Sequence, residues 1–201
     1  RLCPWASPAR ASVRTVEASA TTIAAEALRE ARALAEAPAS SHAATTLVVA
    51  PALDDDATAF VRLAQSVGDE LRADGLAIDV LAFHPERVDA PLPGAAAADD
   101  DDATRHYAAR SPYPTLQLLR TSDLEAARAE WAERGDGMPG ALGLLVENRR
   151  RLRRQTLPAL AARLRGWRAV GDGTRAAAPR MMAEEGGGGG TTGGRLGGRV
   201  E

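Results

Sequence analysis

The chain has 201 residues, with 25 basic and 27 acidic side chains and a formal net charge of −2, which is enough for one domain with or without tails. This balance excludes binding of polyanions through bulk charge, though not through a local basic patch. The single Cys excludes an internal disulfide framework and a thiolate zinc cage. Since no apolar run approaches the roughly 20 residues that span a bilayer, we expect a soluble chain with no membrane partner.

Every basic residue is Arg, because the sequence contains no Lys. We attribute this to a GC-rich genome, so the many arginines are not by themselves a functional signal. Without Lys, a Schiff-base enzyme and a Walker-type phosphate loop are excluded. The chain opens at Arg1 without Met, and we therefore expect an incomplete N-terminus and an intracellular protein, either cytoplasmic or organellar.

The first half of the chain alternates between strand and helix patterns. Short β-branched or continuously apolar runs predict strands, and Thr or Asp before apolar residues spaced three and four apart predicts helices. The expected elements are a strand at 12–17, a helix at 22–36, a strand at 45–50, a helix at 54–73 and a strand at 77–83.

The second half is less regular. A Pro-, Ala- and Asp-rich loop covers 86–102, and two prolines keep 107–114 from forming a helix. The expected elements that follow are a strand at 115–120, helices at 121–134 and 141–155, and an amphipathic stretch with Leu160, Leu164 and Trp167 on one face.

This order predicts one α/β domain, in which helices flank a mostly buried mixed sheet of about four strands. We assign residues 1–157 to this domain, 158–170 to an amphipathic helical extension and 171–201 to a disordered Gly-rich tail.

Three patterns look functional but have simpler explanations. Gly135-x-Gly137-x-x-Gly140 follows a predicted helix, whereas a dinucleotide fingerprint follows a strand. The arginines of 149–154 have no interleaved aromatic rings, which argues against nucleic acid and favours a solvated helix face. Asp99 to Asp102 lack the spacing of a calcium loop. No His or Cys spacing predicts a metal site.

His84 and Arg110 are the best candidates for chemistry. His84 follows a buried strand, and open α/β sheets bind ligands beyond the carboxyl ends of their strands. Imidazole titrates near neutrality and can act as an acid or a base, although a structural His-Pro turn explains His84 equally well. Arg110 precedes Ser111-Pro112-Tyr113-Pro114, a rigid segment that suits either a structural turn or the presentation of a guanidinium to an anion.

Several segments together resemble the domain-of-unknown-function family 1415 over about residues 1–155. The segments that carry the resemblance are Leu2-Cys3-Pro4-Trp5-Ala6, Val13-Arg14, residues 45–51, Ala82-Phe83-His84-Pro85, residues 110–120 and Glu147-Asn148. Asn148 is the only Asn of the chain and stands where the family pattern has one. The family has no established activity, so the resemblance implies candidate site residues and not a reaction.

The chain also departs from the family pattern. The pattern has aromatic rings after His-Pro, where this chain has Glu86 to Asp89. It has Asn directly before the arginine of the Ser-Pro block, where this chain has Ala109. It has His and Glu in the following strand segment, where this chain has Gln117 and Thr121. Gln117 can keep a hydrogen bond but cannot move a proton at neutral pH.

The first hypothesis is therefore a small enzyme or a binding domain for an anionic small molecule, with its pocket at the strand ends. His84 and Cys3 are the catalytic candidates, and the candidate ligand-binding residues are Arg110, Ser111, Tyr113, Gln117 and Asn148. The alternatives are an interaction module that uses the basic C-terminal helix, and a decayed, inactive paralogue. The sequence identifies no cofactor and no oligomeric state.

Overall fold

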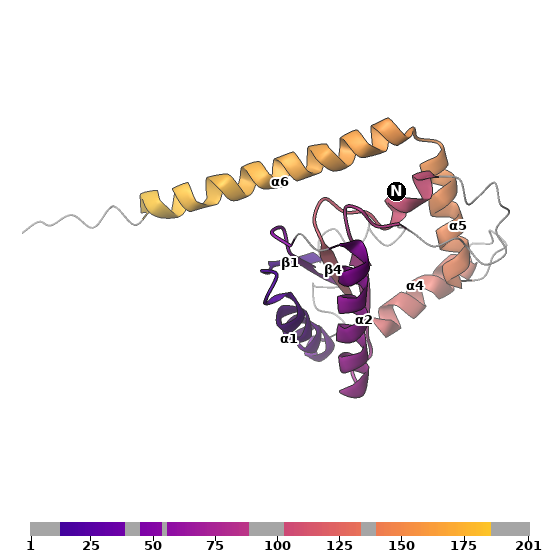
Figure 1. Cartoon of the computed structure of the whole chain (residues 1–201). Helices are drawn as coiled ribbons and strands as arrows, with labels where there is room; N and C mark the ends of the chain where they lie inside the picture. Colours follow the sequence, from indigo (N-terminus) through magenta and orange to yellow (C-terminus); the bar gives the residue numbers. More distant parts are fainter. Residues whose placement is uncertain (1–12, 39–44, 54–55, 89–102, 134–139, 186–201) are drawn as a thin grey trace, which may run out of the picture.

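The computed structural model describes residues 13–38, 45–53, 56–88, 103–133 and 140–185. Its elements in chain order are β1 (Val13–Glu17), α1 (Ile23–Glu36), β2 (Thr45–Val49), α2 (Ala57–Ala73), β3 (Ile78–Phe83), the 3₁₀ helix η3 (Ala103–Ala108), β4 (Thr115–Arg120), α4 (Thr121–Glu133), α5 (Gly140–Arg153) and α6 (Leu157–Glu185) (Figure 1).

The four strands form one mixed sheet in the order β1-β2-β4-β3. β1 and β2 are parallel, and β4 is antiparallel to both β2 and β3. Since β4 is reversed against both neighbours, β1, β2 and β3 all run in one direction, and α1 and α2 are the crossovers between them. The predicted fold class, a single α/β domain with a mixed sheet and flanking helices, is confirmed.

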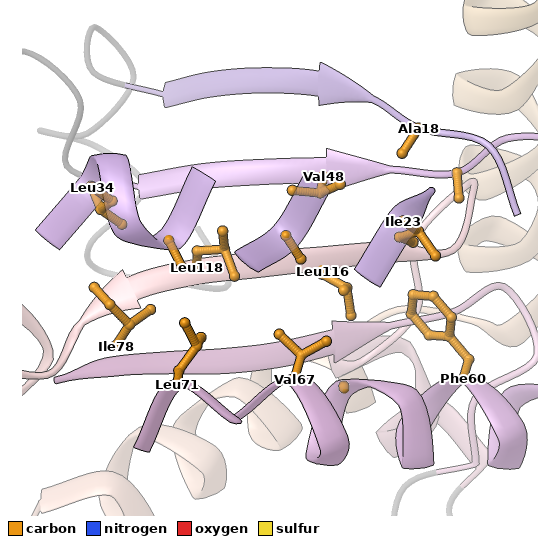
Figure 2. Close-up of a cluster of buried hydrophobic side chains, with 14 of the residues drawn as sticks. Ala18, Ile23, Leu34, Val48, Phe60, Val67, Leu71, Ile78, Leu116 and Leu118 are labelled. Atoms are coloured by element: carbon orange, nitrogen blue, oxygen red, sulfur yellow. The ribbon is translucent and has the colours of Figure 1, made fainter. Parts of the chain in front are cut away.

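The hydrophobic core lies between one face of the sheet and the helices α1 and α2. Successive strand residues point to opposite faces, so alternate residues of β2, β3 and β4 reach this core. Figure 2 shows the labelled side chains Val48, Leu116, Leu118 and Ile78 of the sheet facing Ile23 and Leu34 of α1 and Phe60, Val67 and Leu71 of α2.

The two crossover helices follow the predicted patterns with one difference at their caps. Asp56 caps α2, since its side chain accepts a 2.8 Å hydrogen bond from the Ala59 N–H. Thr22 begins α1 without a side-chain cap; its hydroxyl accepts instead from the N–H of Ser19. The last carbonyls of α1 are bound by Arg120 of β4, which donates to Leu34 and Ala37. The sheet thus holds the C-terminal end of α1.

The 3₁₀ helix η3, which lies between β3 and β4 in the sequence, packs against α5. Residues 107–108 belong to η3 where we expected a loop, while Pro112 and Pro114 lie in irregular backbone as predicted. Arg105 of η3 and Arg149 of α5 are both buried. The predicted solvated face of 149–154 is therefore only partly exposed, because Arg149 points inward while Arg150, Arg153 and Arg154 are exposed.

The C-terminal helix α6 is longer than predicted. We expected an irregular tail from residue 171, but the helix continues to Glu185, and residues 186–201 lie outside the described part. Pro158 is its second residue, a position where a missing N–H costs nothing. The helix runs through Gly171, Gly173 and Pro179, each of which disfavours a helix interior, and the Ala and Met residues after position 175 are the local feature that favours it. Among the described helices, none is both long and apolar enough to cross a membrane.

Candidate functional site

The carboxyl ends of β1, β2 and β3 meet the start of β4 at one edge of the sheet, which we call the strand-end edge. Backbone hydrogen bonds join the segments there: Ala18 N–H to the Val49 carbonyl at 2.8 Å, Ala50 N–H to Pro114 at 2.9 Å and His84 N–H to Ala109 at 3.2 Å. The topology thus brings His84, Arg110, Ser111 and Tyr113 to the same edge, although they come from two distant parts of the sequence.

His84 is 4% exposed and lies on the helix side of the sheet, with its ring 5.7 Å from that of Phe60 in α2. Its Nδ1 accepts a 3.1 Å hydrogen bond from the N–H of Glu86. A nitrogen that accepts from an amide carries no proton, so the neutral ring has its proton on Nε2. The imidazole thus supports the turn at His84-Pro85 through this hydrogen bond.

Arg110 is half-buried and held from two directions. Its Nε donates to the carbonyl oxygen of Arg87 at 3.1 Å, and its guanidinium lies 4.8 Å from the centroid of the Tyr107 ring. In the part of the chain that the structure describes, its Nη1 and Nη2 groups have no acceptor. These two groups can together donate two parallel hydrogen bonds to one carboxylate or phosphate, a bidentate contact.

Ser111 and Tyr113 serve the structure of this edge. The Ser111 hydroxyl donates to the Tyr113 carbonyl, which also accepts from the Thr115 hydroxyl at 2.8 Å. The Tyr113 hydroxyl lies 2.7 Å from both the Arg168 carbonyl and a carboxylate oxygen of Asp172, so its single proton is shared between two acceptors on α6. A side chain on Gly171 would approach this hydroxyl to 2.8 Å. Tyr113 therefore holds α6 against the strand-end edge.

Gln117 lies on the other face of the sheet from His84. It pairs with Leu81 in the register of β3 and β4, whereas Leu116 and Ala82 face the core. Its amide donates to the Thr45 hydroxyl at 3.2 Å, which in turn donates to the Leu118 carbonyl. Successive side chains of a strand point to opposite faces of the sheet, so Gln117 and His84 do not line one pocket.

The two remaining candidates, Asn148 and Cys3, are not among the residues that the structure places at the strand-end edge. Asn148 is half-buried in α5, directly before the buried Arg149 and four residues before the buried Leu152. Cys3 lies outside the described residues, as do Gly135, Gly137 and the run Asp99 to Asp102. Gly140 is the first residue of α5. Over the described ranges, no group of three His, Cys, Asp or Glu side chains is placed to hold a metal ion.

Sequence reasoning missed a groove at the strand-end edge. The groove has a volume of about 490 Å³ and lies between the turns after β1 and β2; its lining residues are Glu17, Ala18, Ser19, Pro51, Ala52 and Asp172. Asp172 comes from the segment expected to be irregular, so no sequence pattern linked it to this edge. The turn residues themselves could have been found, because they follow parallel strands.

Sequence reasoning also missed a buried carboxylate. Glu30 of α1 is 2% exposed and forms ion pairs with Arg14 of β1 at 2.6 Å and with Arg29 at 2.8 Å. The hydrogen bond and charge of Arg14 lower the pKa of Glu30 below its usual value, despite its burial. Arg14 belongs to the Val13-Arg14 pair that the family resemblance includes, and this was the only signal in the sequence.

The predicted stripe of Leu160, Leu164 and Trp167 does not form one exposed docking face. Leu160 is 4% exposed and Leu164 is half-buried, whereas Trp167 is 57% exposed. The two leucines face the α/β domain, since α6 contacts η3 and Tyr113. Figure 1 shows α6, in orange and yellow, above β1 and β4 and projecting past them.

Residues 1–140 match the family described as "Protein of unknown function (DUF1415)". No curated protein matches the chain, and no solved structure does either. The match covers well over half of the 201 residues, and the chain therefore belongs to this family.

Proposed function

We propose that this member of the family binds a small molecule with a carboxylate or phosphate group, and that Arg110 at the strand-end edge contacts this anion. The arrangement of Arg110 carries the proposal. Its Nε and its flat face are already occupied by the Arg87 carbonyl and the Tyr107 ring, and its two Nη groups have no acceptor within the described chain.

This arrangement favours binding for two physical reasons. A guanidinium held by one hydrogen bond and one ring loses little conformational entropy when an anion arrives. Half-burial also strengthens its attraction for a negative charge compared with a fully exposed arginine. An arginine of this kind is more than a solubilising side chain, since it is kept in place with its two outer nitrogens unused.

His84 places a buried imidazole at the same edge, with its Nδ1 accepting from the Glu86 N–H. If the ligand is also a substrate, this imidazole is the candidate acid or base. The proposal itself concerns binding, and whether a reaction follows is decided by the identity of the ligand.

The test is a thermal-shift screen of the purified chain against small phosphates, nucleotides and carboxylates. A ligand at a hundred times its Kd adds about 2.7 kcal/mol to the unfolding free energy, which is a clear rise in Tm. We expect at least one anion to raise the Tm of the wild type and to lose its effect in Arg110→Gln. Arg128→Gln, on an exposed arginine of α4, is the matched control and should respond as the wild type does.

A second control uses Gln117. Because Gln117 lies on the other face of the sheet, Gln117→His should leave the ligand response unchanged. An equal response in Arg110→Gln and the wild type would overturn the proposal, and so would a panel to which the wild type does not respond. If Gln117→His created binding that the wild type lacks, the decayed-paralogue alternative would be favoured instead.

A further inference from the structure

The face of the sheet that lies opposite the core is largely apolar. The helices α1 and α2 both pack on the core face, and alternate strand residues point the other way. We call these residues the open face of the sheet; they are Val13, Thr15 and Glu17 of β1, Thr45, Leu47 and Val49 of β2, Thr115, Gln117 and Leu119 of β4, and Asp79, Leu81 and Phe83 of β3. A sheet face in water ordinarily carries polar side chains, so these apolar residues indicate a face that another segment covers.

The middle of the open face is its most exposed part. Thr15, Leu47, Gln117 and Leu81 stand side by side across the four strands. Leu81 is 39% exposed, and Leu47 and Gln117 are half-buried. The members nearer the strand ends are more buried, and they include Thr45, Thr115 and Leu119. The surface that calls for a cover is therefore the row from Thr15 to Leu81.

The charge of the open face is purely acidic. Its only ionisable side chains are Glu17, at one edge, and Asp79, at the other, and no arginine belongs to it. Residues 1–12 have the opposite charge, since they contain Arg1 and Arg10 and no acidic residue. Opposite charge favours this segment as the occupant over the Asp-rich run of residues 89–102.

The composition of residues 1–12 also suits an apolar sheet face. Among the segments outside the described ranges, this one alone contains an aromatic residue, Trp5, and Leu2 lies close to it in the sequence. Pro4 and Pro8 lack the N–H that a strand donates to its neighbour, so the segment is unsuited to extending the sheet beside β1. The family match covers residues 1–140, so this segment and the strands of the open face belong to the same matched region.

The reach of the segment is sufficient. It enters the sheet at Val13, the first residue of the edge strand β1, and Leu81 lies on the opposite edge strand β3. Neighbouring strands are about 4.8 Å apart, so the four strands give a face roughly 14 Å wide. Residues 5–12 span up to about 26 Å when extended. Trp5 can therefore reach any strand of the sheet.

We propose that residues 1–12 fold back across the open face and cover its middle row, with Trp5 in contact with Leu47 and Leu81. Arg1 and Arg10 then lie against a face whose only charges are those of Glu17 and Asp79. One consequence concerns the two catalytic candidates: Cys3 comes to the face of the sheet opposite His84, so the two do not act on one substrate. This proposal is independent of the anion site at Arg110.

The first test uses Cys3, the single cysteine of the chain, as a position marker. In full-length Leu81→Cys, a new thiol stands in the middle of the open face. We expect oxidised glutathione to convert it and Cys3 into an intramolecular disulfide, found by peptide mass mapping. Ser66→Cys, at an exposed position of α2 on the other side of the sheet, is the matched control and should react about tenfold more slowly or less.

The second test follows Trp5 by fluorescence. With Trp131→Phe and Trp167→Phe, Trp5 is the only indole of the chain. We expect emission at shorter wavelength than in urea, and a shift to longer wavelength when Leu81→Arg is added. Thr15→Arg, in the same row, should act in the same direction, whereas Gln65→Arg on the exposed side of α2 should change nothing. Circular dichroism verifies that each variant stays folded.

Three results would each overturn the proposal. Equal rates of disulfide formation in Leu81→Cys and Ser66→Cys would show that residues 1–12 have no preference for the open face. Trp5 emission that matches the urea-unfolded chain and ignores both arginine substitutions would show that the indole stays in water. A disulfide between two chains, together with a dimer in sedimentation of the wild type, would mean that a second copy covers the open face.

Discussion

At the residue scale, the chain uses its charged side chains in two different ways. Glu30 is buried and bound by Arg14, so its charge is part of the stability of β1 and α1. Arg110 is held in place but keeps its Nη groups without an acceptor among the described residues. Arg14 and Arg110 both lie in segments that the family resemblance marks, Val13-Arg14 and the Ser-Pro block. The resemblance therefore marks an arginine with a structural ion pair as well as the proposed anion-binding arginine, and only their contacts distinguish them.

Glu30→Gln should destabilise the fold by about 1–3 kcal/mol at pH 7, since a charged hydrogen bond is lost in a buried position. The pKa of Glu30 is lower in the folded chain than its unfolded value of about 4.3. Its contribution is therefore complete above that unfolded value and is lost as the pH falls through the lowered folded pKa.

Urea unfolding of the wild type and of Glu30→Gln at several pH values between 7 and 3 checks this prediction. The difference in unfolding free energy between the two should shrink as the pH falls. A difference that stays constant would show that Glu30 acts through packing and not through its charge. Glu26→Gln is the control, because Glu26 forms its ion pair with Arg29 near the surface of α1 and is less buried than Glu30.

At the element scale, the attachment of α6 to the α/β domain depends mainly on its contact with Tyr113. Of residues 157–174, whose burial the structure describes, Leu160 alone is buried, and the Tyr113 hydroxyl reaches α6 at Arg168 and Asp172. A helix attached by so few contacts opens locally more easily than α1 or α2, whose apolar faces lie in the core. This explains why Tyr113, which the sequence suggested as a ligand contact, has a structural role.

Tyr113→Phe should loosen α6 without disturbing the sheet. The variant keeps the ring under Arg168 but loses the hydrogen bonds to Arg168 and Asp172. We expect faster amide hydrogen exchange in residues 160–174 and unchanged exchange in β2 and β4. Faster exchange throughout the sheet would mean that Tyr113 supports the core, contrary to its position at the edge.

At the scale of the whole molecule, the structure consists of an α/β domain with its own core and a long helix laid across one end. The core cluster draws its side chains from the sheet, α1, α2 and the turns after β1 and β2, and includes none of the α6 side chains in the described range 157–174. Removal of residues 157–201 should therefore leave a chain that still unfolds in one cooperative transition.

Thermal unfolding of the shortened chain, compared with Leu118→Ala in the full chain, tests this division. Leu118 is fully buried at the centre of the sheet, and its truncation should cost about 2–5 kcal/mol. We expect the deletion to cost less than this substitution. Loss of the cooperative transition on deletion would show that α6 belongs to the folding unit.

The sequence by itself determined the order of strands and helices, the α/β class and the family, because these depend on local periodicity, capping residues and motifs that neighbouring positions carry. The strands at 45–50, 77–83 and 115–120 and the helices at 22–36 and 54–73 were predictable for this reason. The same local signals failed after residue 171, where isolated glycines suggested an irregular tail and a favourable Ala-rich stretch continued the helix instead.

Only the tertiary structure decided which of the candidate residues meet. The reversed strand β4 brings Arg110 and Tyr113 to the edge where β3 delivers His84, while the one-residue alternation of the same strand puts Gln117 on the opposite face. The contact between Tyr113 and α6 joins residues 55 or more positions apart. Strand register and long-range packing are properties of the folded chain as a whole, and no local pattern contains them.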